Sequence, residues 1–255
     1  MTPQTLSQPP IIFASLEAQF NPTKAVELSR LEKLADSVSS GYPKKQNVDT
    51  QEIRFGVNNS QQPFQNFQSV RSGFQVSNEL GNRFLKFEIN AFSVSFQGGH
   101  YPPWPSIRDL FLRFYSEYLE ASRQHEISRI GLRIVNRLEL PIHESTDLSN
   151  FIHTEIELPK YPNFPNDVSF FSTEVVVPFD QKYGCRVRQQ TEASRHDAAT
   201  GEEYLGFILD IDVYKDALLE ASDIDQLSPI FEKLREMKNL AFFGTLTERT
   251  VKRYE

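Results

Sequence analysis

The chain has 255 residues and a formal net charge of −7, with 39% hydrophobic and 24% charged residues. This acidic balance argues against a protein that coats nucleic-acid phosphates, because such proteins normally carry a basic surface. The single cysteine excludes an internal disulfide, no apolar run approaches the roughly 20 residues of a membrane span, and the N-terminus lacks a secretion-signal pattern. We therefore expect a cytoplasmic protein that does not associate with a membrane.

The first predicted elements are a strand and a helix. Alternation over residues 11–20 places Ile12, Ala14, Leu16, Ala18 and Phe20 on one face of a strand. Asn21-Pro22 is a typical helix start, and leucines at helical spacing predict a helix that runs to about Ser39 and ends before Gly41.

The next segments predict a mainly antiparallel sheet followed by a second helix. Strands are expected at 51–57, 67–78 and 83–97, with a loop at 58–66 and a turn at Gly81-Asn82. The segment 83–97 is long enough to break into two strands. After it, Ser106 is a candidate cap for a helix with a wide apolar stripe that starts at Ile107.

The second part of the chain predicts a similar series of elements. A strand is expected at 129–140, a short helix near 146–153, strands at 167–178, 184–192 and 204–214, and a polar hairpin loop at 194–203. Ser228-Pro229 is the predicted start of the last long helix. Thr245-Leu246-Thr247-Glu248 is read as a capping box, which predicts a final short helix from about Leu246.

The order of elements therefore repeats after about 120 residues, which favours an internal duplication. Tyr42-Pro43 falls opposite Tyr161-Pro162, and Ile107 falls opposite Ile230. We predict an α+β fold of two related β-α-β-β-β-α halves, mainly antiparallel sheets backed by helices. The expected division is a flexible N-terminus at 1–10, a first half at 11–126 and a second half at 127–255, with a core shared between the halves.

Motifs that would identify an enzyme are missing from the sequence. There is no phosphate-binding loop, dinucleotide fingerprint, nucleophile elbow or HExxH zinc motif. The five histidines are scattered, and Cys185 lies in a predicted strand, where a lone cysteine is usually a small buried hydrophobe. We expect no metal or cofactor, and the sequence favours a non-enzymatic protein without deciding the point.

Two polar groups in predicted strands are candidate ligand or partner sites. Arg133 and Arg137 share one face of a strand, while Asn136 lies on the opposite, otherwise apolar face and needs hydrogen-bond partners there. Asp210 and Asp212 share a face of another strand. The favoured interpretation is that an arginine pairs with an aspartate across the sheet. Ligand binding and metal chemistry by the two carboxylates are the alternatives.

Further candidate positions carry positive charge or an amide. Lys238 and Asn239 lie late in the last long helix, where a lysine also complements the helix dipole. Arg186, Arg188 and Gln190 alternate along one strand and could contact single-stranded nucleic acid. The acidity of the chain argues against that partner.

Several segments resemble one known protein family. They are the strand after Pro9-Pro10, GLRIVNRLEL at 131–140, LDIDVY at 209–214 and LREMKNLAFFGTLTERT at 234–250. They are similar to a sporadically distributed prokaryotic family of similar length and unknown function. The resemblance implies no activity or cofactor, although the patchy occurrence of that family is similar to that of mobile-element or defence genes. It singles out Arg133, Asn136, Arg137, Asp210, Asp212, Lys238, Asn239 and Glu248.

Two functional hypotheses follow from the sequence. The first is a non-enzymatic binding or regulatory module that contacts a protein partner, since open sheet edges can accept a strand. The second is a small-molecule sensor or enzyme with a pocket between the two halves. The sequence does not give the oligomeric state.

Overall fold

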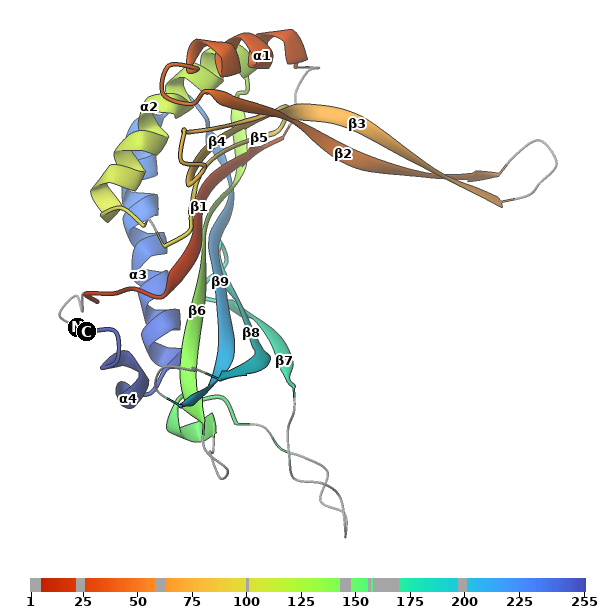
Figure 1. The fold of residues 1–255 in the computed structure, drawn as a ribbon. Helices are drawn as coiled ribbons and strands as arrows, with labels where there is room; N and C mark the ends of the chain where they lie inside the picture. The colour runs from red at the N-terminus through yellow and green to blue at the C-terminus, as the bar shows by residue number, and fades with distance from the viewer. Residues whose placement is uncertain are drawn as a thin grey trace.

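The protein has an α+β fold in which helices cover one face of a large antiparallel sheet (Figure 1). This computed structural model describes residues 6–21, 26–57, 63–99, 101–142, 148–155, 157, 170–196 and 201–255. Within these ranges the strands form one nine-stranded sheet in the order β2-β3-β4-β5-β1-β6-β9-β8-β7.

The elements have the following bounds. The strands are β1 (Ile11–Phe20), β2 (Lys44–Val57), β3 (Pro63–Ser77), β4 (Arg83–Glu88), β5 (Ala91–Gln97), β6 (Glu126–Ile142), β7 (Ser172–Pro178), β8 (Tyr183–His196) and β9 (Glu203–Glu220). The α-helices are α1 (Leu28–Ser37), α2 (Trp104–Ser122), α3 (Leu227–Thr245) and α4 (Glu248–Val251), and two short 3-10 helices are η1 (Leu148–Asn150) and η2 (Ile224–Gln226).

The centre of the sheet is the antiparallel pair β1 and β6. Alternation buries Leu16 of β1 and Leu132 of β6 as direct partners on the helix-covered face. A register shift between Ile11 and Phe13 changes the alternation at the start of β1. As a result Ile12, which was predicted on the buried face, is 39% exposed, and Ile11 is buried instead.

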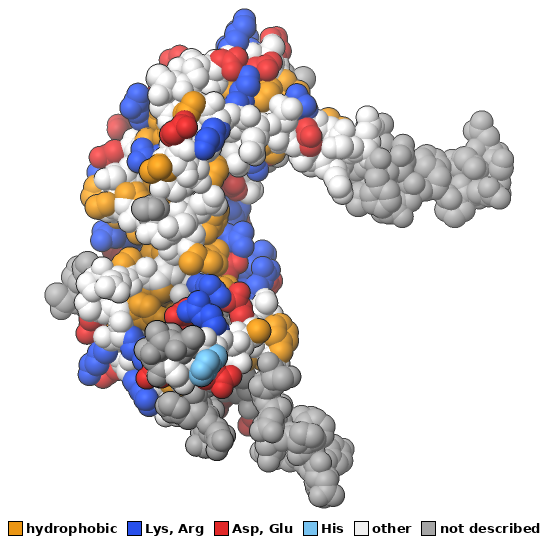
Figure 2. Space-filling model, in the orientation of Figure 1, with side chains coloured by type: hydrophobic (Ala, Val, Ile, Leu, Met, Phe, Trp, Pro, Cys, Tyr) orange, Lys and Arg blue, Asp and Glu red, His pale blue; other side chains and the backbone are white. Residues whose placement is uncertain are grey.

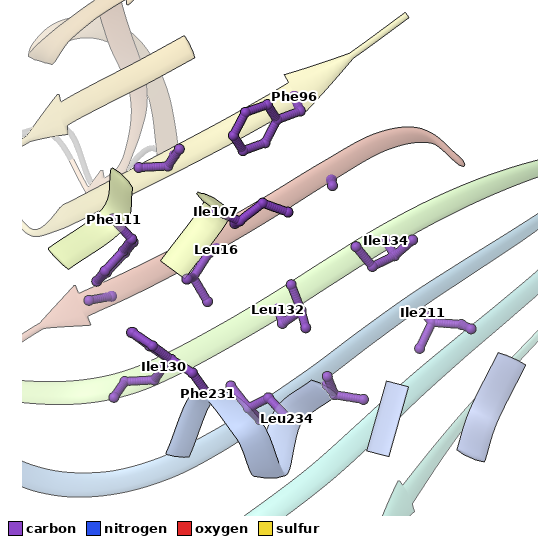
Figure 3. Close-up of a cluster of buried hydrophobic side chains, with 14 of the residues drawn as sticks. Leu16, Phe96, Ile107, Phe111, Ile130, Leu132, Ile134, Ile211, Phe231 and Leu234 are labelled. Atoms are coloured by element: carbon purple, nitrogen blue, oxygen red, sulfur yellow. The ribbon is translucent and has the colours of Figure 1, made fainter. Parts of the chain in front are cut away.

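The hydrophobic core lies between this sheet and the helices (Figure 3). Phe111 of α2 and Phe231 of α3 meet edge to face with their ring centroids 5.2 Å apart, so the two long helices are joined through the core. Tyr115 is fully buried and donates its hydroxyl to the Ala221 carbonyl oxygen at 2.9 Å, beside the end of β9. One continuous core therefore links the N-terminal and C-terminal parts of the chain.

The strands at the N-terminal end of the sheet differ from the predicted ones in length. β2 begins at Lys44, before the predicted 51–57, and β3 begins at Pro63, inside the predicted loop; residues 58–62 of that loop lie outside the described residues. The two strands pair along their whole length and extend as a hairpin away from the rest of the sheet (Figure 1). The predicted strands were too short because these polar segments show no alternating apolar pattern. They form strands through their pairing with each other. The predicted segment 83–97 does break into two strands, β4 and β5.

Three helix starts were predicted at the wrong residue. Asn21 does not cap α1, which begins at Leu28, because its backbone N–H and its side-chain amide both bond to Glu126. α2 begins at Trp104 rather than after Ser106. α3 begins at Leu227, before Ser228-Pro229.

The remaining corrections concern the C-terminal part of the chain. The final helix α4 begins at Glu248 and not at Leu246, because Thr247 is its cap and accepts the Thr250 N–H, while Thr245 Oγ1 donates to the Ala241 carbonyl at 2.8 Å. Only the 3-10 helix η1 stands where a short helix near 146–153 was expected, and residues 143–147 lie outside the described residues. Tyr161-Pro162 and residues 1–5 also lie outside them.

Candidate functional site

The predicted site residues lie on opposite faces of the sheet. Arg133 and Arg137 of β6 and Asp210 and Asp212 of β9 lie on the face that the helices leave open, opposite the buried face of the same strands. Asn136 lies on the helix-covered face, and Lys238 and Asn239 belong to α3. The seven residues therefore form two separate groups rather than one site.

Arg133 and Asp210 form a bidentate ion pair across β6 and β9. Nε and Nη2 of Arg133 donate to the two carboxylate oxygens of Asp210 at 2.9 and 2.7 Å. These hydrogen bonds raise the pKa of Arg133 above its ordinary value. The predicted cross-strand pairing of an arginine with an aspartate is thus confirmed. Arg137 contacts neither aspartate and donates instead to Glu192 Oε2 at 2.8 Å.

Asp212 is held by Arg129, a residue that the sequence analysis did not select. Arg129 Nη2 donates to both Asp212 oxygens at 2.9 and 2.8 Å, and its guanidinium lies 4.7 Å from the Tyr214 ring centroid. Gly131 makes room for this arrangement, because a Cβ there would lie 2.5 Å from Arg129 Nη1. The period of two that places Arg133 and Arg137 on one face also includes Arg129, so the signal was present in the sequence.

The open face is close to electrically balanced around these pairs. Arg186 and Arg188 of β8 both contact Glu174 of β7, and Arg188 also lies 3.8 Å from Asp210. Because each aspartate already holds a guanidinium, its oxygens are poorly placed to coordinate a cation. Among the described residues, no three His, Cys, Asp or Glu side chains are grouped as metal ligands.

The open face is concave and contains a broad, polar hollow. It has a volume of about 810 Å³ and is lined by side chains of β1, β3, β4, β5, β6, β8 and β9, Ser15, Glu17 and Arg133 among them. Charged side chains of both signs gather along the inner side of the curve, below the β2–β3 hairpin (Figure 2). Such a surface suits polar contacts with a large partner better than enclosure of a small apolar ligand.

The two edges of the sheet differ in character. On β7, Val175, Val176 and Val177 are 49%, 53% and 45% exposed, and β7 pairs only with β8 among the described residues. A hydrophobic patch is visible at this position in Figure 2. At the opposite edge, β2 carries Lys44 and Lys45, and Lys45 bonds to Asp36 of α1 at 2.6 Å. Charges of this kind protect a sheet edge from pairing, and β7 lacks them along its three valines.

A separate cavity of about 400 Å³ lies on the helix-covered side. Its walls come from the N-terminal segment 6–11, the segment 101–104 at the start of α2, β6 and α3. Asn136, Lys238 and Asn239 all line it, so the second group of predicted residues does meet. Asn136 Nδ2 donates to the Leu209 carbonyl oxygen at 3.1 Å. Asn136 thus has the hydrogen-bond partner expected for a buried asparagine, and it also lines the cavity.

Cys185 is a buried residue of β8, as its position in a predicted strand indicated. Burial, and to a lesser extent the nearby Asp212 carboxylate, together raise the pKa of its thiol to about 11. At neutral pH the sulfur is therefore protonated, which makes it a weak nucleophile.

Comparison with known proteins gives no match to a family model, to a curated protein or to a solved structure. The resemblance to the sporadically distributed prokaryotic family stays a prediction. In the part of the chain that the structure describes, no helix has the length and apolar character needed to cross a membrane.

Proposed function

We propose that this protein is a non-enzymatic binding or regulatory module that holds an extended segment of a protein partner at the edge of strand β7. The observation that carries the proposal is the exposed edge with its three consecutive valines, each 45% exposed or more. An extended peptide that adds to such an edge gains main-chain hydrogen bonds, and its alternate side chains contact the strand's apolar side chains.

The alternation of β7 gives a peptide two apolar surfaces to contact. Val175 and Val177 pair with Val187 and Cys185, whose side chains are buried, so they lie on the helix-covered side. Val176 pairs with Arg186 and lies on the open side. A partner strand rich in β-branched residues, with few charges opposite the valines, fits this edge best.

The charge pattern of the open face supports a protein partner over nucleic acid. The arginines Arg129, Arg133 and Arg188 are each paired with a carboxylate. A surface that tracks phosphates needs unpaired cations, because its affinity comes from replacing counterions. The concave face would then add polar contacts around the strand.

The duplication of the chain belongs to the same proposal. We infer two related halves that meet at the β1–β6 pair, from which β5 and β9 continue the sheet on either side. Each half places a long helix, α2 or α3, after its last strand. In this arrangement β2, with its lysines, and β7, with its exposed valines, are the equivalent outer strands of the two halves. Only β7, in the second half, is open to a partner. A cytoplasmic location and a mobile-element or defence context remain part of the proposal.

Affinity purification followed by mass spectrometry of proteins and small molecules tests the proposal. The comparison uses the wild-type chain, Val176→Lys on β7 and, as a matched control, Thr50→Lys on the exposed edge strand β2. The partner should co-purify with wild type and control but not with Val176→Lys, and β7 amides should gain hydrogen-exchange protection in the complex. A partner that binds Val176→Lys equally well, without protection of β7, would show that this edge is not the binding site.

A second candidate function is small-molecule sensing or catalysis. The 400 Å³ cavity between the start of α2 and α3 favours this function. Cavities of this size hold small ligands, and they often occur between packed structural elements. A small molecule that co-purifies with the wild-type chain and raises its thermal stability would support this candidate.

A further inference from the structure

The cavity beside α3 is lined by positive charge, whereas the chain as a whole is acidic. Lys238 and Arg235 both line it, and no Asp or Glu lies among its described lining residues, although the whole chain has a net charge of −7. The two cations repel each other, and an anion bound between them would offset that repulsion.

Lys238 has no anionic partner among the described residues. Arg235 contacts Glu232 at 3.4 Å, outside the lining of the cavity, but within the described residues Lys238 has neither a hydrogen bond nor an ion pair. Burial, and to a lesser extent the neighbouring Arg235 guanidinium, together lower the pKa of Lys238 to about 8. An anion bound beside the half-buried Lys238 would offset both effects.

The walls of the cavity indicate what kind of molecule would bring that anion. Trp104, Phe242 and the prolines Pro10 and Pro103 supply flat apolar surface, and Asn239 adds an amide beside Lys238. Trp104 is fixed because its indole N–H donates to Glu232 Oε1 at 2.7 Å. A ligand with an apolar body and one negatively charged end matches this distribution of groups.

We propose that this cavity binds a small organic carboxylate, with the carboxylate at Lys238 and Asn239 and an apolar, preferably aromatic, body against Trp104 and Phe242. The site goes beyond the strand-binding role proposed for β7 and does not depend on it.

The single tryptophan of the chain gives a direct readout, because it is Trp104 in the cavity wall. The probes are bromobenzoate, bromophenylacetate and bromophenylpropionate, whose bromine quenches indole fluorescence on contact, each compared with its neutral amide. At least one acid should quench Trp104 saturably and bind about tenfold or more tightly than its amide, the size expected for a charge-assisted hydrogen bond.

Two variants and a pH series make the result specific. Lys238→Met should weaken acid binding by about tenfold or more, whereas Lys233→Met, at an exposed lysine of the same helix, should leave it unchanged. For the wild-type chain, acid affinity should fall by up to about tenfold from pH 7 to pH 9 as Lys238 loses its proton. Arg235 and Tyr101 also line the cavity, and Tyr101 stays protonated over this range because burial raises its pKa to about 12.

The proposal is overturned by any of three results. They are the absence of saturable quenching by all three acids, equal binding of acids and amides, and unchanged acid affinity in Lys238→Met. Failure of Val176→Lys to affect partner capture would bear on the β7 proposal alone, so the two ideas fail separately.

Discussion

Replacing Asp210 with asparagine separates a structural role of the open-face ion pairs from a binding role. The Asp210 side chain is 10% exposed and accepts two hydrogen bonds from Arg133, whose side chain is 48% exposed. The asparagine amide would place an N–H₂ group against guanidinium donors, so at least one charge-assisted bond is lost. Because Arg133 can regain water, we expect a loss of about 1 to 2 kcal/mol in the free energy of unfolding, less than for a fully buried pair.

The assay is urea denaturation of Asp210→Asn, of Asp212→Asn and of the matched control Glu192→Gln. The Glu192–Arg137 pair is more exposed on the carboxylate side, at 36%, so the control should lose less than about 0.5 kcal/mol. Asp212 is 19% exposed and should lie between the two. A 2 kcal/mol loss would lower the melting temperature by roughly 4 to 8 °C in a chain of this size.

The result that refutes this reasoning is an Asp210→Asn variant of wild-type stability. If that variant also lost its protein partner, the ion pair would be a binding feature and the cross-strand interpretation would be incomplete. A double-mutant cycle with Arg133→Gln measures the coupling directly and should give about 1 kcal/mol or more.

Three further predictions concern groups that are buried or half-buried. The pKa of Lys238 is about 8 in the folded chain and 10.5 in the unfolded chain, so between these values the unfolded chain binds more protons than the folded chain. The unfolding free energy of wild type should therefore rise by about 1 kcal/mol relative to Lys238→Met between pH 7 and pH 9, as measured in parallel urea titrations. Tyr115→Phe leaves the Ala221 carbonyl without its buried donor and should lower the unfolding free energy by about 1 to 3 kcal/mol, measured by the same method. Cys185 should react with a thiol reagent only at the rate of unfolding, since it is buried with a pKa near 11; rapid labelling of native protein would contradict its placement in the core.

Sequence periodicity was a good guide where one face of an element is buried. The apolar stripe of α2 and the alternation of β1, β6 and β9 predicted which residues face the core, except at Ile11 and Ile12, and Asn136 was placed correctly on the buried face. Element boundaries were less predictable. Asn21, Ser106 and Thr245 have side chains suited to capping, but the helices start at other residues. At Asn21 the backbone N–H and the side-chain amide bond to Glu126 instead.

The partners of the candidate residues required the tertiary structure. Arg133 and Asn136 are three residues apart on one strand, so the period of two already places them on opposite faces. Which strand lies beside which, and therefore that Arg133 meets Asp210 while Arg137 meets Glu192, depends on the register of β6, β8 and β9. No local pattern encodes that register.

The sequence by itself determined the α+β class and, apart from the start of β1, the buried face of β1, β6 and β9, because burial of apolar side chains follows a period that a single strand or helix already displays. Only the tertiary structure decided that Asn136, Lys238 and Asn239 share a cavity with Trp104, and that β7 is left at an edge with its valines exposed. Both features depend on contacts between segments far apart in the chain, whose energies arise only when the sheet and its helices come together.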